Sequence, residues 1–441
     1  GIGSGVMQSI GANAHTGTVG VGYNSLAALT SGGHNTAIGY NSMLKLTTGA
    51  ENVAIGKLAM EEADGGESYN VAVGFHAMGD VDHDDSDANV AIGGSALAGG
   101  DAAVKNCVAI GYNALDHTAG NAQDGTIAIG KDALTACTSA ASNLAIGYQA
   151  AKTLTTGGSN TIVGYNSLIA AHTAANANTT LGTGALQNAS GSTCVGNVAI
   201  GMGALTAGGG DLTGNIAIGK NALDDTAGND HEGTVAIGQQ ALTACTTGAK
   251  NLAVGYQAGL AITTGQYNTI VGSEAADDVV DGNNNTVMGR GAMGGNMGGT
   301  SEGSSDNVFL GYASGGGNWA DQDCSNAVAI GSLAMSGALA GDGADGSVAV
   351  GKSALAALTS GMNNVAVGYL ALTTTTTGYN NTAIGHQAGT ALVAGSDNNT
   401  AVGKGALSAG NNDSTHNNTA LGHQAGDTIT TGSNNTYVGT N

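Results

Sequence analysis

The chain has 441 residues, of which 78 are Gly, none is Pro and 3% are aromatic, and its formal net charge is −22. So few aromatic side chains cannot fill the wide core of a large globular protein, and no segment approaches the roughly 18 apolar residues of a membrane-spanning helix. The acidic balance argues against nucleic acid as a partner, because phosphate binding needs clustered Lys and Arg. We therefore expect no nucleic-acid partner and no membrane insertion.

A five-residue pattern that ends in glycine recurs along the whole chain, and 24 copies can be aligned on that glycine from Gly22 to Gly439. Repetition at a short fixed period predicts a stacked repeat architecture. An aliphatic residue, or Met in a single copy, precedes each of these glycines, and Asn stands four residues before most of them. In three representative copies these residues are Asn35, Ile38 and Gly39, then Asn52, Ile55 and Gly56, then Asn381, Ile384 and Gly385.

The residues before the glycine alternate in size, as in Val53-Ala54-Ile55, and Ala takes the central place in 17 of the 24 copies. Such alternation predicts a β-strand with branched residues on one face and small residues on the other. We expect the small face to allow a close approach, for instance by another chain. Stacked in register, the Asn residues are expected to form a ladder of side-chain amides.

A second apolar segment follows each glycine, with Ala or Ser at the third position and usually Leu or Met at the fourth, as at Leu26 and Met60. One repeat is therefore expected to supply two short strands and two turns, which form one coil of a solenoid. We predict an all-β protein, a parallel β-solenoid of the β-roll type with coils of about 18 residues. A triangular β-helix would need three aliphatic signatures per coil, and each coil has a single strong one.

Residues 1–441 are interpreted as one continuous array of about 24 coils. The glycine spacings run 17, 17, 18, 19, 18 and 19, and then repeat, which indicates duplication in blocks of six coils. The blocks cover residues 22–129, 130–237 and 238–350, with a partial block at 351–441. Extra residues fall before the next Asn, so we expect surface loops at one corner of the coil, where recognition often resides.

The insert at residues 79–87 carries carboxylates two residues apart. Oxygen-rich loops of this kind can ligate calcium. The Ca²⁺ candidates are Asp80, Asp82, Asp84, Asp85 and Asp87. The insert lacks the Gly and the distal Glu of an EF-hand, and a solvated charged loop is the alternative interpretation. We expect no other cofactor and no catalytic residues, because no nucleophile–base or paired-carboxylate arrangement recurs.

The five cysteines are far apart and odd in number, so they predict neither a disulfide framework nor a metal site. We expect them to be small apolar core residues. They are Cys107, Cys137, Cys194, Cys245 and Cys324.

The units Asn35–Met43 and Asn143–Ala150 resemble the head repeat of trimeric autotransporter adhesins and a repeat of bacteriophage tail fibres. The resemblance covers essentially the whole chain. It implies a left-handed parallel β-roll that assembles as a homotrimeric fibre, with the small Ala face near the three-fold axis.

Together, the repeat and the resemblance predict a non-enzymatic structural or adhesive fibre, extracellular or on a cell or virion surface. Its corner loops would be presented to a surface receptor or a glycan. The alternative is a subunit of a self-assembling filament or sheath with a purely structural role, in which copies join head to tail through open strand edges.

Overall fold

The computed structural model describes residues 1–9, 15–100, 102–118, 123–139, 141–169, 175–188, 191, 193–206, 210–224, 226, 229–294, 303–317, 324–337, 343–408, 415–429 and 432–440. The chain divides into two compact units, one of residues 1–215 and 227–229 and the other of residues 216–226 and 230–441. Each unit is a parallel β-solenoid, and none of the residues in the described ranges is helical. The predicted all-β solenoid fold is confirmed.

A three-residue strand precedes every one of the 24 repeat glycines. In the first unit these strands are β1 (Val19–Val21), β2 (Thr36–Ile38), β3 (Val53–Ile55), β4 (Val71–Val73), β5 (Val90–Ile92), β7 (Val108–Ile110), β9 (Ile127–Ile129), β10 (Leu144–Ile146), β11 (Thr161–Val163), β13 (Thr179–Leu181) and β15 (Val198–Ile200). In the second unit they are β17 (Ile216–Ile218), β19 (Val235–Ile237), β20 (Leu252–Val254), β21 (Thr269–Val271), β22 (Thr286–Met288), β23 (Val308–Leu310), β24 (Val328–Ile330), β25 (Val348–Val350), β26 (Val365–Val367), β27 (Thr382–Ile384), β28 (Thr400–Val402), β29 (Thr419–Leu421) and β30 (Thr436–Val438). Shorter two-residue strands are β6 (Val104–Lys105), β8 (Gln123–Asp124), β12 (Ala175–Asn176), β14 (Cys194–Val195), β16 (Leu212–Thr213) and β18 (His231–Glu232).

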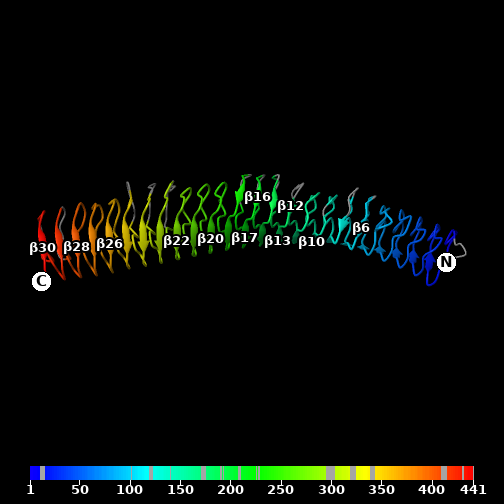
Figure 1. Cartoon of the computed structure of the whole chain (residues 1–441), viewed down its shortest axis with the longest axis horizontal. Coiled ribbons are helices and arrows are strands. Elements are labelled where there is room, and N and C mark those ends of the chain that lie inside the picture. Colours follow the sequence, from blue (N-terminus) through cyan, green and yellow to red (C-terminus); the bar gives the residue numbers. More distant parts are fainter. Residues whose placement is uncertain are drawn as a thin grey trace. The chain divides into compact units, whose positions relative to one another are not determined.

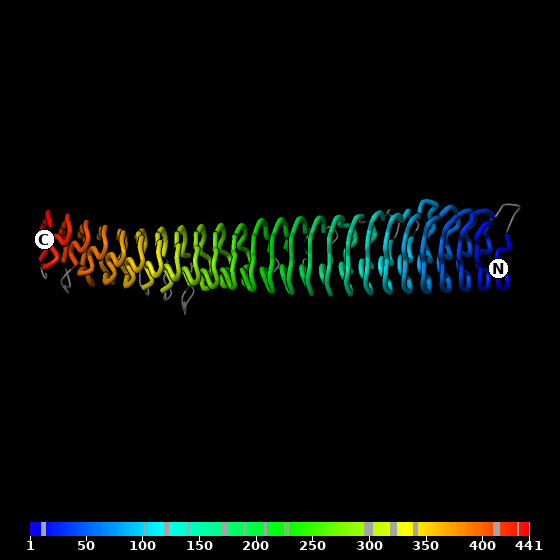
Figure 2. Tube along the Cα trace, turned by 90° about the horizontal axis from the view of Figure 1, so that it is seen from below, coloured from blue at the N-terminus to red at the C-terminus, as the bar shows by residue number. Residues whose placement is uncertain are grey.

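Successive coils within a unit pair in parallel and in register, so equivalent residues stack in columns. In β2 and β3, Thr36 pairs with Val53, Ala37 with Ala54, and Ile38 with Ile55. The strand arrows of neighbouring coils accordingly lie side by side (Figure 1), and the coils follow one another as a row of narrow turns when the view is turned (Figure 2). Backbone donors are used from coil to coil throughout, which explains why a chain without Pro suits this fold.

The two faces of the strand are the reverse of the arrangement that the resemblance implies. The central residues point into the chain's own interior, and Ala37, Ala54 and Ala72 are fully buried. The flanking Ile38 and Ile55 are 39% and 38% exposed. The Ala column faces its own core and is not available to another chain, so its implied place near a three-fold axis is wrong.

The core is one residue thick on each side, which is why the central residue is usually small. Across from the Ala column lie the Leu and Met side chains of the second apolar segment, such as Leu26 and Met43, which are also fully buried. Where the central residue is Phe309, the opposite position is Gly315, whose added Cβ would lie 2.9 Å from the Phe309 ring. The two columns therefore compensate each other in volume, as close packing requires.

The second apolar segment is not a strand, contrary to the prediction. Its backbone alternates in handedness, and Leu26, Met43 and Met60 have φ values of 53°, 50° and 51°. Left-handed backbone costs a non-glycine residue about 1–2 kcal/mol. That cost is offset because each side chain is buried and each backbone N–H reaches the neighbouring coil, as from Met43 to the Ala59 carbonyl at 3.0 Å.

The repeat asparagines form the predicted ladder of buried amides. The Asn52 side-chain nitrogen donates to Asn35 Oδ1 at 3.2 Å and to the Glu67 carbonyl at 2.7 Å. Its Oδ1 in turn accepts the backbone N–H of Asn70 at 3.0 Å. Because each amide joins three coils, the ladder fixes the register at the corner that precedes the strand.

Candidate functional site

The outer face of the strands exposes apolar side chains in each of the two units. It consists of the two residues that flank the buried central residue, and we call it the outer sheet face. Exposed aliphatic members include Ile38, Ile55, Ile92, Leu181 and Ile384, each at least 38% exposed. Contiguous apolar surface of this kind commonly marks an interaction site in soluble proteins.

An aromatic ridge borders the outer sheet face at the position directly after the repeat glycine. Tyr23 and Tyr40 stack at a ring distance of 5.3 Å, and Tyr148 and Tyr165 stack at 5.2 Å. The Lys57 ammonium lies 5.9 Å from the Tyr40 ring centre. Parallel in-register stacking puts equivalent side chains about 4.8 Å apart, so these contacts follow directly from the repeat.

The charges of the chain are separated between this face and the corners. The two outer columns and the ridge contain none of the 32 acidic residues, although six of the ten Lys and Arg residues lie on the ridge. Those six are Lys57, Lys131, Lys220, Arg290, Lys352 and Lys404. The outer sheet face is therefore uncharged and its bordering ridge is aromatic and cationic, while the acidic side chains lie elsewhere on the coil.

The five aspartates proposed as calcium ligands do not converge on one point. Asp80 pairs with His76 at 3.3 Å, and Asp85 lies 3.8 Å from the Lys105 ammonium. Asp84 and Asp87 each accept a backbone N–H from the preceding coil, from Gly66 at 3.3 Å and from Ser68 at 2.7 Å respectively. These four side chains thus have separate protein partners, and Asp82 faces a different set of residues.

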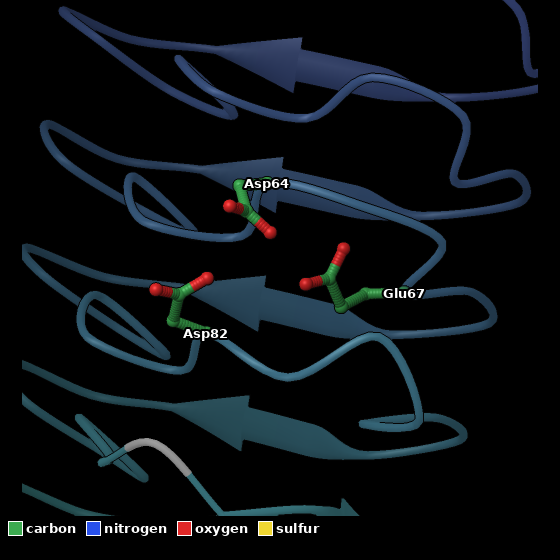
Figure 3. A group of neighbouring side chains, drawn as sticks. All are labelled: Asp64, Glu67 and Asp82. Atoms are coloured by element: carbon green, nitrogen blue, oxygen red, sulfur yellow. The ribbon is translucent and has the colours of Figure 1, made fainter.

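Asp82 meets two carboxylates of the preceding coil, Asp64 and Glu67. One oxygen of each side chain lies within 4.8 Å of the others. In Figure 3 the three carboxylates face a common space between neighbouring coils. We call this group the acidic corner. Asp64 and Asp82 are exposed at its rim, and Glu67 forms its buried base.

Glu67 has an unusual environment for a carboxylate. The residue is fully buried; Oε2 accepts the Gly65 N–H at 3.1 Å, whereas Oε1 has no hydrogen-bond partner. Burial raises the pKa of Glu67, against the opposing effect of the Glu67 and Gly65 backbone N–H groups. Burial also raises the pKa of Asp82, and the nearby Asp64 charge adds to that effect.

Asp64 and Glu67 were missed at the sequence level because they belong to the coil before the acidic insert. A signal was nevertheless present, since Glu67 stands three residues before Asn70 in a column that points inward. At other described positions of this column, the backbone carbonyl that accepts a hydrogen bond from a ladder asparagine belongs to an uncharged residue. Examples are Gly49, Ser86 and Val104. A charged residue at an interior position is the anomaly that repeat alignment would have exposed.

All five cysteines are free and buried, as the sequence predicts. Burial raises the pKa of Cys107 to about 11 and those of Cys194 and Cys245 to about 12. Because the thiolate is the reactive form, less than about one part in a thousand of these thiols is ionised at pH 8.

We expect the native chain to be inert to a thiol-reactive disulfide reagent at pH 8, and to release five thiol equivalents once guanidinium unfolds it. Absorbance of the released thiolate gives both counts. Rapid reaction of the native protein would contradict the buried placement of these side chains.

A surface hollow in the second unit is lined by Glu274, Asp277, Asp278, Arg290 and Tyr312, among others. Burial, followed by the Asp278 charge, raises the pKa of Asp277 to about 6. Asp277 Oδ1 is buried and accepts no hydrogen bond in the structure. This hollow groups acidic, cationic and aromatic side chains of the second unit, and repeat spacing gave no indication of it.

No protein-family model and no curated protein sequence matches the chain. The fold therefore defines the class to which the protein is assigned, a parallel β-solenoid. Within the described residues, no helical segment has the length and apolarity needed to cross a bilayer.

Proposed function

We propose that the chain is a non-enzymatic structural and adhesive fibre, extracellular or on a cell or virion surface, which associates with copies of itself through the outer sheet face. The observation that supports this proposal is the absence of any carboxylate from the two outer columns, one aliphatic or Met and the other Val, Ile, Leu or Thr, in a chain of net charge −22. Copies of so acidic a chain repel each other over most surfaces, and the outer sheet face is where that repulsion is weakest.

A second copy is the occupant that suits this face. The columns repeat from coil to coil, so a second copy presents the same spacing and can contact many coils at once. Burying exposed Ile and Val side chains contributes about 25 cal/mol per Å² of apolar surface, and the sum grows with the number of coils in contact. The resemblance to trimeric adhesin heads favours three copies, whose branched residues rather than alanines would then meet.

Adhesion is assigned to the corners, where coil length varies and acidic inserts such as residues 79–87 are found. Loops on a rigid scaffold can change without disturbing the core, and for that reason they commonly carry recognition. The proposed ligand is a cell-surface receptor or glycan. Loss of binding to a glycan array after the 79–87 insert is shortened to the length of a neighbouring coil would support this assignment.

Sedimentation equilibrium tests the association. We expect a mass of three chains for the wild type and of one chain for a variant with Ile55→Glu and Ile92→Glu, because paired carboxylates would have to be buried in the interface. A control with His34→Glu and Ala141→Glu, both exposed and off the outer sheet face, should keep the wild-type mass.

A single-chain mass for the wild type at all concentrations would contradict association through the outer sheet face. Growth without limit, visible as filaments in electron micrographs, would instead favour the filament or sheath alternative. Filaments that persist in the Ile55→Glu and Ile92→Glu variant would place their contacts at the ends of the array.

A further inference from the structure

We propose that the acidic corner of Asp64, Glu67 and Asp82 is a binding site for one Ca²⁺ ion, which joins two successive coils. The site differs from the outer sheet face and does not depend on the proposed function. Asp64 and Glu67 follow strand β3, and Asp82 follows strand β4, so a bound ion would connect the two coils at a corner where their side chains otherwise repel (Figure 3).

The negative charge of the acidic corner is not balanced by a cationic side chain. Three carboxylates lie within 4.8 Å of one another, and within the described residues none of them forms an ion pair with Lys, Arg or His. Lys45 interacts electrostatically with Asp64 and Asp82, but its ion pair is with Glu62. Grouping like charges costs free energy unless a cation or protons compensate them.

The Glu67 carboxylate points into the acidic corner. Its side chain is fully buried, one oxygen is held by the Gly65 N–H, and the other, Oε1, has no hydrogen-bond partner. A buried acceptor without a partner costs about 1–3 kcal/mol, and more when it is charged. Figure 3 shows this carboxylate pointing into the space between Asp64 and Asp82, where an ion would supply the missing contact.

The size of the site favours Ca²⁺. Calcium–oxygen bonds of 2.3–2.6 Å place oxygens on opposite sides of the ion about 4.6–5.2 Å apart. The three oxygens of the acidic corner all lie within 4.8 Å of one another, a limit that falls inside this range. Mg²⁺ would need opposite oxygens within about 4.2 Å and holds its water more tightly. The exposed rim leaves room for the water molecules that complete a coordination shell.

Neighbouring coils show what the same positions contain when no ion is needed. The interior column that contains Glu67 has Gly49 before it and Ser86 after it. The column that leads to Asp64 contains Thr30 and Thr47, whose hydroxyls donate to the carbonyls of the next coil at 3.1 and 2.8 Å. The acidic corner thus replaces a hydrogen-bonded column by carboxylates, and it does so in adjacent coils.

The test is calorimetric titration of the EDTA-stripped full chain with CaCl₂ and separately with MgCl₂, together with thermal melting in each salt. We expect one Ca²⁺ equivalent per chain to be lost in Glu67→Ser, which copies Ser86, and in the double variant Asp64→Thr and Asp82→Thr, which copies Thr47. Both variants should melt at the same temperature with and without Ca²⁺, whereas the wild type should melt higher with it.

Asp85→Asn is the matched control, because it removes an exposed carboxylate of the same insert outside the acidic corner. It should keep the wild-type stoichiometry and Ca²⁺-dependent melting. Glu67→Ser with unchanged Ca²⁺ stoichiometry and affinity would overturn the proposal. So would a wild-type chain that takes up no Ca²⁺ at about 1 mM, the weak end of extracellular calcium sites. The latter result would leave a proton shared between Asp64 and Asp82 as the explanation of their proximity.

Discussion

We expect Gly39→Ala to break the contact between two coils, at a cost of about 4 kcal/mol, which exceeds the roughly 1–3 kcal/mol usual for an overfilled position because the clash is with backbone. Gly39 has φ of 149°, and a Cβ added there would lie 2.2 Å from the carbonyl oxygen of Gly56 in the next coil. The backbone of Gly39 and the backbone of Gly56 are each hydrogen-bonded to neighbouring coils, so neither residue can move alone. The repeat glycine is therefore required both by its own backbone conformation and by the next coil.

Hydrogen exchange is the suitable measurement, because unfolding of a repeat array is not two-state and damage at one interface stays local. Amides of β2 and β3 should exchange about a thousandfold faster than in the wild type, following tenfold per 1.4 kcal/mol. Gly125→Ala is the control, since Gly125 has φ of 62° but nothing within 4 Å of its added Cβ. It should cost only about 1 kcal/mol. Equal protection in the two variants would contradict the role assigned to the coil-to-coil clash.

The stacking of coils could be predicted from sequence because one residue of each repeat is constrained by its neighbours in space. The glycine, the asparagine and the residues between them recur since each contacts its own copy in the next coil. The backbone of the second apolar segment could not be predicted in this way, because Leu26 and Met60 have the spacing of strand residues. Hydrophobic spacing records which side chains are buried, and these are, but it carries no information on the sign of φ.

Alternation of large and small residues does not show which of the two sets faces the core, because the pattern is the same in either case. Ala37 and Ile38 would give the same pattern with either one in the core. Which residue faces the core depends on the width of the coil. That width is set by the Leu and Met residues of the second apolar segment, across the core from the strand. The acidic corner could not be predicted from the sequence for a related reason. Asp82 becomes a candidate ligand only when the preceding coil places Asp64 and Glu67 beside it.

We expect Asn381→Ala to cause a large loss of stability, because it interrupts the asparagine ladder. The Asn381 side chain donates to Asn364 Oδ1 at 3.1 Å and to the Ser396 carbonyl at 2.7 Å, and it accepts the Asn399 N–H at 3.0 Å. Truncation leaves the Ser396 carbonyl and the Asn399 N–H without these partners inside the protein. At about 1–3 kcal/mol for each buried unsatisfied group, we expect a loss of about 3 kcal/mol or more.

The chain itself contains the control for this loss, because Ser347 occupies the ladder position of an earlier coil. Its hydroxyl donates to the Gly361 carbonyl at 3.3 Å and accepts the Asn364 N–H at 3.1 Å. Asn381→Ser should therefore keep both kinds of bond and cost about half as much as Asn381→Ala, measured as exchange of the amides in β27 and β28. If the two variants lose equal protection, the side-chain volume rather than the hydrogen bonds of the ladder holds the coils in register. If Ser protects, the ladder requires a group that both donates and accepts, which explains why Asn is so frequent there and why Ser is tolerated.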